Sequence, residues 1–235
     1  MARVDGDADV AAAAALIGEP ARAALLLALM EEDALPAREL AARARIAPST
    51  ASGHLARLVA GGLLTGERRG RHRYFRLADP AVAAALEALS TIAPARPVRS
   101  LRDATVSEAI RHARTCYDHL AGRLGVELTA ALERHGVLLH DGAGFAVGPA
   151  APSCLADLGI DLAVLSARRR PLVRSCLDWS ERRRHVAGSL GAALADRLFE
   201  LGWLRRRQTN RSVEITTLGE SRLRSEFGLE LERIV

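Results

Sequence analysis

Apolar and polar residues alternate with the period of α-helices near the start of the chain. Three segments, residues 8–17, 20–31 and 36–44, place apolar side chains three and four positions apart. Gly18 and Pro20 separate the first two segments, because glycine is a poor helix former and proline is tolerated only in the first turn of a helix. Such segments dominate the chain, and stretches with strand character are few and short. The sequence therefore predicts a mainly α fold with small β-hairpins, of the α+β class.

The next segment combines a helical pattern with an unusual set of small polar side chains. A helix is predicted to begin at Pro48 or Ser49 and to end at Gly61-Gly62, with Leu55, Leu58 and Val59 on its buried side. Its first turns and outward face carry Ser49, Thr50, Ser52, Gly53, His54 and Arg57. Small hydroxyl side chains let a helix approach a ligand closely and still donate hydrogen bonds. Capping of the helix explains Ser49 and Thr50, but not the rest of the set.

Positive charge is concentrated just after this helix. The 235 residues carry a net charge of +5, and all 33 basic residues are arginines. Residues 36–78 alone contain nine arginines and two acidic residues, and the stretch LLTGERRGRHRYFRL predicts two short strands around a turn at Gly70. The arginines of this hairpin include Arg68, Arg69, Arg71 and Arg73. A helix, a tight turn, a polar helix and a basic hairpin are typical of a winged helix-turn-helix, which binds double-stranded DNA.

These residues carry a resemblance to a known family. The stretches ALIGEPARAALLLALME and ELAARARIAPSTASGHLARLVAGGLLTGERRGRHRYFRLADP resemble the ArsR family of bacterial transcriptional repressors, over about residues 8–93. The resemblance implies a homodimer in which residues 8–17 and 82–92 pair, a near-palindromic operator, and release of DNA by an effector. Metal-sensing members carry Cys-x-Cys before the recognition helix or Asp/His ligands on the last helix. Residues 34–60 contain no cysteine and residues 79–93 no histidine, so that metal chemistry is not carried over.

The rest of the chain is predicted to be a separate sensor domain that contains a repeat. The Pro/Arg-rich stretch APARPVRS favours a DNA-binding and dimerisation domain at residues 1–93, a linker at 94–102 and a second domain at 103–235. Nine residues, from His119 to Leu138, recur 66 positions later, from His185 to Leu204. We interpret this as a duplication of winged-helix-like units. The second copy lacks most of the polar donors of residues 49–57, which favours a packing role.

Cysteine and histidine offer the remaining candidate chemistry. His112, Cys116 and His119 are spaced i, i+4 and i+7, which predicts one face of a helix and a ligand set for zinc, copper or arsenic(III). Cys176 and His185 are the counterparts in the second copy. Six extra residues precede His185, so the two copies are not expected to share one ligand geometry.

Other interpretations of these residues stay open. The cysteines could act as small apolar core residues with hydrogen-bonded histidines nearby. They could also be redox-active, or the effector could be a small molecule bound without a covalent bond near Trp179 and Trp203. The metal or metalloid ion is therefore one of several candidate effectors.

Three further expectations concern class and location. An odd count of three cysteines predicts free thiols in a reducing compartment. The acidic first residues do not have the layout of a signal peptide and no apolar run is long enough to span a membrane, which favours the cytoplasm and no membrane partner. Glycine-rich phosphate loops, Gly-x-Ser-x-Gly and His-Glu-x-x-His are absent, so an enzyme is not expected. A Cys/His-based enzyme and an architectural DNA-binding protein without an effector are the alternatives.

Overall fold

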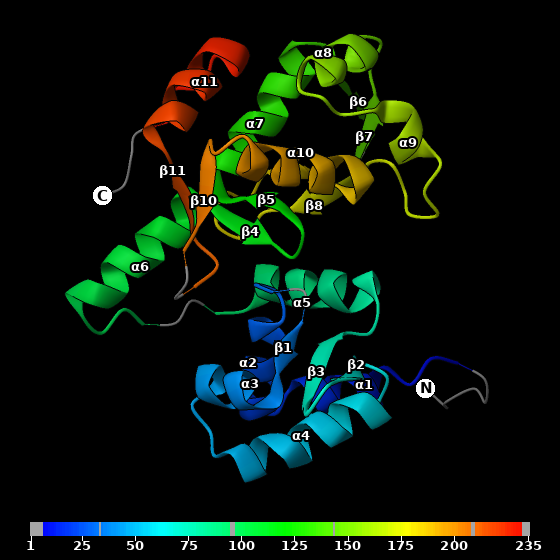
Figure 1. Ribbon diagram of the computed structural model, residues 1–235, viewed down its shortest axis with the longest axis vertical. Coiled ribbons are helices and arrows are strands. Elements are labelled where there is room, and N and C mark those ends of the chain that lie inside the picture. Colours follow the sequence, from blue (N-terminus) through cyan, green and yellow to red (C-terminus); the bar gives the residue numbers. More distant parts are fainter. Residues whose placement is uncertain (1–6, 33, 95–96, 143, 208–209, 232–235) are drawn as a thin grey trace. The chain divides into compact units, whose positions relative to one another are not determined.

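The chain folds into two compact units, Met1–Leu86 and Glu87–Val235, coloured blue to cyan and green to red in Figure 1. The predicted boundary lies slightly further along, after residue 93. Residues 95–96 of the predicted linker lie outside the described residues. The computed structural model describes residues 7–32, 34–94, 97–142, 144–207 and 210–231.

The first unit has the predicted helices and hairpin in the predicted order. Its elements are α1 (Val10–Ile17), α2 (Pro20–Ala28), β1 (Leu35–Pro36), α3 (Ala37–Ala44), α4 (Pro48–Ala60), β2 (Leu64–Arg69), β3 (His72–Leu77) and the first part of α5 (Pro80–Ile92). Strands β2 and β3 form an antiparallel hairpin, and β1 pairs with the other edge of β3. This is a winged helix-turn-helix, as predicted, with α4 in the place of the recognition helix.

Local sequence explains where the helices of the first unit begin. Glu19 caps α2, because its carboxylate accepts a hydrogen bond from the Arg22 amide while Pro20 occupies the first turn. Pro48 likewise opens α4 after an extended Ala47. Among the described residues, no single helix meets the length and hydropathy required to cross a membrane. The pair α1 and α2 meets them only when taken together, and the two helices are bent by 84° at their break.

The second unit contains the same order of elements twice. The first copy runs through α6 (Leu101–His112), β4 (Arg114–Cys116), β5 (His119–Ala121), α7 (Gly122–Arg134), β6 (Leu138–Asp141), β7 (Gly144–Val147) and α8 (Ala151–Asp157). The second runs through α9 (Leu162–Ser166), β8 (Arg174–Leu177), β9 (Arg184–Ala187), α10 (Gly188–Glu200), β10 (Leu204–Arg206), β11 (Val213–Ile215) and α11 (Thr217–Phe227). Within each copy the strands pair as two antiparallel hairpins.

The two long helices of the repeat share one core. Helices α7 and α10 are both 13 residues long and lie 66 positions apart in the sequence, as the recurring residues predict. Each buries a row of leucines in the same hydrophobic cluster: Leu124, Leu128 and Leu132 from α7, and Leu190, Leu194 and Leu198 from α10. The residues of α10 equivalent to the polar face of α4 are mostly buried, which agrees with the packing role expected of this helix.

A buried ion pair connects the two copies inside this unit. Arg114 of β4 donates to Asp178, just after β8, over 2.7 Å, and both side chains are 0% exposed. The Asp178 carboxylate also accepts hydrogen bonds from the amides of Gly122, Ser180 and Glu181. Full satisfaction of its acceptors is what allows a carboxylate to stay charged in the protein interior.

We expect Arg114→Ala to destabilise the second unit by about 3–5 kcal/mol, because it leaves the Asp178 charge buried without its cation. The matched control is Arg205→Ala, which removes an exposed arginine 3.8 Å from Glu214 and should change stability by less than about 0.5 kcal/mol. Urea denaturation of both variants measures the difference. Equal free energies of unfolding would contradict a structural role for the buried pair.

Candidate functional site

Helix α4 presents its small polar residues to solvent. Ala51, Leu55 and Leu58 are buried against the rest of the first unit. The opposite face carries the exposed residues Ser49, Thr50, Ser52, Gly53 and Arg57. The Ser52 hydroxyl donates to the Pro48 carbonyl oxygen over 2.9 Å, which leaves its lone pairs free to accept a hydrogen bond from outside. This face of α4 is exposed to solvent and is therefore accessible to a ligand.

His54 differs from the other predicted contact residues of α4. Its side chain is only 17% exposed, and its Nδ1 lies 3.5 Å from the Glu19 carboxylate at the start of α2. The imidazole therefore has a partner inside the first unit, and a direct DNA contact from His54 stays a prediction.

The hairpin of β2 and β3 concentrates positive charge at its tip. Arg68 lies directly opposite Arg73, and the turn at Gly70-Arg71 joins the strands. Glu67 forms an ion pair with Arg69 over 3.2 Å, whereas Arg68, Arg71 and Arg73 have no carboxylate partner in the part of the chain that the structure describes. Exposed guanidinium groups of this kind on a projecting hairpin suit the phosphates of a nucleic acid.

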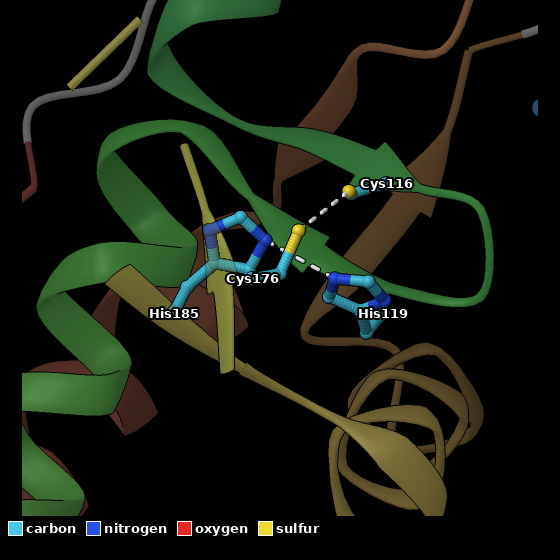
Figure 2. A group of neighbouring side chains, drawn as sticks. All are labelled: Cys116, His119, Cys176 and His185. Atoms are coloured by element: carbon cyan, nitrogen blue, oxygen red, sulfur yellow. Dashed lines mark hydrogen bonds between the residues drawn. The ribbon is translucent and has the colours of Figure 1, made fainter. Parts of the chain in front are cut away.

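A second candidate site lies in the core of the other unit. Cys116, His119, Cys176 and His185 each offer one ligand atom, and these four atoms lie within 4.8 Å of one another (Figure 2). Cys116, His119 and His185 are buried and Cys176 is half-buried. His112, the fifth predicted residue, lies at the end of α6 outside this group. The prediction that His112, Cys116 and His119 share a helical face is wrong, because α6 ends at His112 and a hairpin follows.

The two copies contribute to this cluster in the same way. In each first hairpin the cysteine lies directly opposite the histidine: Cys116 opposite His119, and Cys176 opposite His185. Residues directly opposite in an antiparallel pair project from the same face of the sheet. The expectation that the six extra residues prevent a shared geometry is therefore wrong, since they lengthen only the loop between β8 and β9.

Two glycines allow each long helix to lie close to the hairpin that precedes it. A Cβ atom on Gly125 of α7 would lie 2.5 Å from the Leu120 carbonyl oxygen, and one on Gly191 of α10 would lie 2.6 Å from the Val186 carbonyl oxygen. The other copy's histidine is also near: the same Cβ atoms would lie 3.8 Å from the Cβ of His185 and 3.2 Å from the Cβ of His119. A side chain at either position would therefore push the helix away from its own hairpin, and at Gly191 it would also crowd His119.

Charge within the cluster is shared between the thiols and the imidazoles. The two sulfur atoms are 3.7 Å apart, and the Nε2 atoms of His119 and His185 are 3.1 Å apart. Hydrogen bonds from Cys116 and from both histidines lower the pKa of the Cys176 thiol, whereas burial raises the pKa of the Cys116 thiol. Burial opposes a charged His119, but its contacts with Asp118 and Cys176 outweigh burial and raise its pKa. The cluster thus favours one thiolate beside an imidazolium.

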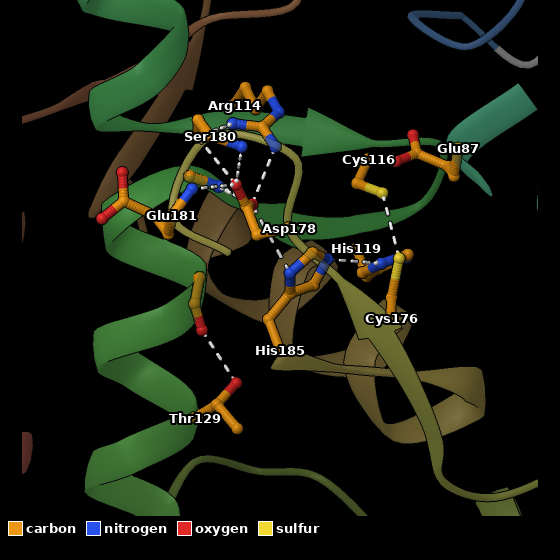
Figure 3. A network of polar contacts seen from close by, with 12 residues as sticks. Glu87, Arg114, Cys116, His119, Thr129, Cys176, Asp178, Ser180, Glu181 and His185 are labelled. Carbon is orange, nitrogen blue, oxygen red and sulfur yellow. Dashed lines mark hydrogen bonds and ion pairs between the residues drawn. The ribbon is translucent and has the colours of Figure 1, made fainter. Parts of the chain in front are cut away.

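A carboxylate stands behind each histidine (Figure 3 shows the one behind His185). Asp118 Oδ1 lies 3.3 Å from His119 Nδ1, and Arg170 holds Asp118 through both guanidinium nitrogens. Asp178 Oδ2 lies 3.5 Å from His185 Nδ1, which is long for a hydrogen bond but close for ionic attraction. Burial alone would raise the pKa of Asp178, but the charge of Arg114 and the donors Ser180 and Gly122 hold it well below its usual range.

The two tryptophans lie in different surroundings. Trp203 lines a pocket of about 410 Å³ together with Cys154, Leu158, Arg197 and Phe227, among others. Trp179 packs beside the guanidinium groups of Arg114, 4.7 Å from its ring centroid, and Arg111, at 5.6 Å. A small-molecule site near Trp203 is therefore a separate candidate from the thiol and imidazole cluster.

Comparison with known proteins finds a match to part of the first unit and another to nearly the whole chain. Residues 17–67 match a family model described as a helix-turn-helix domain. A Bacillus subtilis (strain 168) protein described as an uncharacterized HTH-type transcriptional regulator, YdfF, is 41% identical over 212 residues, which are 90% of this chain and 94% of that protein.

Two solved structures resemble a smaller part of the chain. The transcriptional repressor BigR from Xylella fastidiosa is 27% identical, covers 37% of this chain and 89% of its own, and has a TM-score of 0.35. The cadmium metal-sensor CMTR from Mycobacterium tuberculosis is 28% identical, covers 40% of this chain and 100% of its own, and has a TM-score of 0.32.

Proposed function

We propose that this chain, which belongs to the HTH-type transcriptional regulators, is an ArsR-like repressor that an effector in its second unit releases from operator DNA. The observation that carries the proposal is the exposed polar face of α4 beside a hairpin rich in exposed arginines. As a regulator of transcription it binds DNA, and because its target is the chromosome we place it in the cytoplasm.

The first unit divides the work of DNA recognition between two elements. In our proposal α4 enters the major groove and reads base edges with Ser49, Thr50, Ser52, Gly53, His54 and Arg57. The hairpin contacts phosphates with Arg68, Arg69, Arg71 and Arg73, which fix the position of the protein but do not read the sequence. Arg69 contributes less than the others, because Glu67 already neutralises part of its charge.

Exposed apolar residues support a homodimer. All eight residues of α1 are apolar and none is buried, and Val10 is 72% exposed. On α5, Leu89 is 43% and Ile92 79% exposed. Apolar helix surface of this kind is stabilised when a second copy covers it. Two recognition helices related by a two-fold axis require a near-palindromic operator.

The second unit is the proposed site of the effector. It is larger than the DNA-binding unit, and its core holds two thiols and two imidazoles that DNA binding does not use. An effector shifts a regulator only if it binds the DNA-competent and DNA-incompetent shapes with different affinity. A ligand that joins groups from two copies of a repeat meets that condition, because its affinity depends on how the copies are arranged.

We expect Arg71→Ala and Arg73→Ala to weaken binding to operator and random DNA alike and to reduce the salt slope by about one unit for each phosphate that is no longer neutralised. Ser52→Ala and Arg57→Ala should instead reduce the preference for operator over random DNA, by about 1–3 kcal/mol for each base that the helix no longer reads. Gel-shift titrations at several salt concentrations measure both effects.

The control for this experiment is Arg222→Ala on α11, where an exposed arginine of the second unit is removed. It should leave affinity and salt slope unchanged. Unchanged affinity in the two hairpin variants would show that the hairpin is not the phosphate-binding element.

We expect the wild-type chain to sediment as a dimer at micromolar concentration, and the double variant Val10→Asp, Ile92→Asp to sediment as a monomer, since charge is costly in an apolar interface. Val164→Asp on α9, where the wild-type side chain is 56% exposed, is the matched control and should stay dimeric. A wild-type chain that is monomeric with and without DNA would contradict the dimer.

We expect the double variant Cys116→Ser, Cys176→Ser to bind operator DNA normally but to be insensitive to the effector. A DNA-release assay with zinc, arsenite, mercuric ion and peroxide compares it with the wild type and with Cys154→Ser, which should respond as the wild type does. Identical responses of the wild type and the double variant would exclude the thiols and favour a small molecule bound in the pocket at Trp203. No release of the wild type by any ligand, including small molecules screened by thermal stabilisation, would favour the architectural alternative.

A further inference from the structure

We infer that Cys116, His119, Cys176 and His185 form a tetrahedral site for one zinc-class divalent cation, which joins the two copies of the repeat. That the ion acts as the effector rests on the proposed function, whereas its binding does not. The inference begins with the source of the ligands: each copy supplies one sulfur and one nitrogen from directly paired positions of a hairpin. Neither copy has enough ligands of its own to complete a site.

The separations of the donor atoms fit such an ion. Zn–S bonds of about 2.3 Å at a tetrahedral angle place two sulfurs about 3.8 Å apart, and Zn–N bonds of about 2.0–2.1 Å place two nitrogens about 3.3–3.4 Å apart. The sulfurs here are 3.7 Å apart and the Nε2 atoms 3.1 Å apart. A disulfide would require the sulfurs to close to about 2.05 Å. The sulfur-sulfur and nitrogen-nitrogen separations are therefore close to those of a tetrahedral zinc site, and all four donor atoms lie within 4.8 Å of one another.

The carboxylates beside the two histidines are compatible with metal binding. Asp118 and Asp178 lie beside the Nδ1 atoms of His119 and His185, a position that favours a proton on Nδ1 and a free lone pair on Nε2. The two Nε2 atoms are 3.1 Å apart and share a hydrogen bond, and a cation that replaces the shared proton would be bound by both lone pairs. Carboxylate, imidazole and metal in series is the usual arrangement around protein-bound zinc.

The chemistry of the ligands selects the kind of ion. Thiolate and imidazole suit zinc and similar soft or borderline cations, and they exclude magnesium and calcium, which require oxygen ligands. Two thiolates balance a doubly charged cation, so the loaded site is neutral in the core. Binding is coupled to proton release, because both sulfurs must be thiolates and both imidazoles neutral.

The burial of the site favours a structural role for the ion rather than a catalytic one. Three of the four proposed ligands are buried, and together the four would fill every position around a tetrahedral ion. Closed sites of this kind stabilise a fold, whereas a catalytic zinc keeps one position for water or substrate. Loading the site therefore stabilises one arrangement of the two copies, and the stability of the second unit becomes dependent on metal.

The test is metal binding by the full-length chain, purified under reducing conditions and stripped with a chelator. Titration with Co²⁺ should give one equivalent per chain, with the ligand-field bands of tetrahedral cobalt and a thiolate charge-transfer band, and Zn²⁺ should displace it. Cys176→Ser and His185→Gln should lower the affinity by at least about 100-fold, because each removes a ligand. Asp118→Asn should lower it by about 10–100-fold, as expected for a carboxylate that orients a ligand.

Matched controls are Cys154→Ser, which removes the third thiol, and His140→Gln, whose wild-type side chain is 66% exposed. Both should bind Co²⁺ as the wild type does. Far-ultraviolet circular dichroism establishes that each variant is folded. A reduced, folded wild-type chain that binds neither Co²⁺ nor Zn²⁺ would overturn the inference, as would an equal loss of affinity in the controls.

Gel shifts on the same preparations separate this inference from the proposed function. A chain that binds one equivalent of metal but no DNA would support the metal site and contradict the proposed function. A chain that binds DNA but no metal would support the proposed function and contradict the metal site. Metal binding without any change in DNA affinity would support the site and exclude the ion as the effector.

Discussion

The buried carboxylate of Asp178 is the constraint on which the second unit depends. A charged group with no exposure to water must be surrounded by donors, and Asp178 obtains them from β4 through Arg114, from the first amide of α7 and from its own loop. These elements come from both copies of the repeat, so the carboxylate favours the arrangement that surrounds it with donors. Because Asp178 also stands behind His185, the orientation of that imidazole follows from the same constraint.

The duplication explains how four ligands from distant parts of the chain meet. Each long helix packs on the hairpin of the other copy, and Gly125 and Gly191 let it lie close to its own hairpin as well. This packing places Cys116 and His119 beside Cys176 and His185. A cluster built in this way responds to the arrangement of the two copies, since neither copy positions more than two of the ligands.

Much of the first unit and all four residues of the cluster could be predicted from the sequence, whereas the geometry that brings the four together could not. Helices α2, α3 and α4 have proline at or just before their first residue, and α1 is capped by Asp9, which are local signals. Strands β4 and β5 have three residues each, too few to show alternation, so the spacing of His112, Cys116 and His119 suggested a helix. The signal that could have found the shared geometry is the pattern Cys-x-Asp, which occurs at Cys116 and at Cys176 and is followed in both copies by a histidine. The number of residues before the histidine differs, but the cysteine can still pair with the histidine when the extra residues lie in the hairpin loop.

Arginine has opposite roles in the two units, and composition alone could not distinguish them. Arg71 and Arg73 are exposed on the hairpin, where their charge is available to a polyanion. Arg114 and Arg170 instead neutralise Asp178 and Asp118, the carboxylates behind the two histidines. The first unit thus directs its charge outward, and the second uses it to hold imidazoles in place. In the proposed function, this oriented ligand set is the input, because an effector must bind one state of a regulator better than the other and a cation would complete the set.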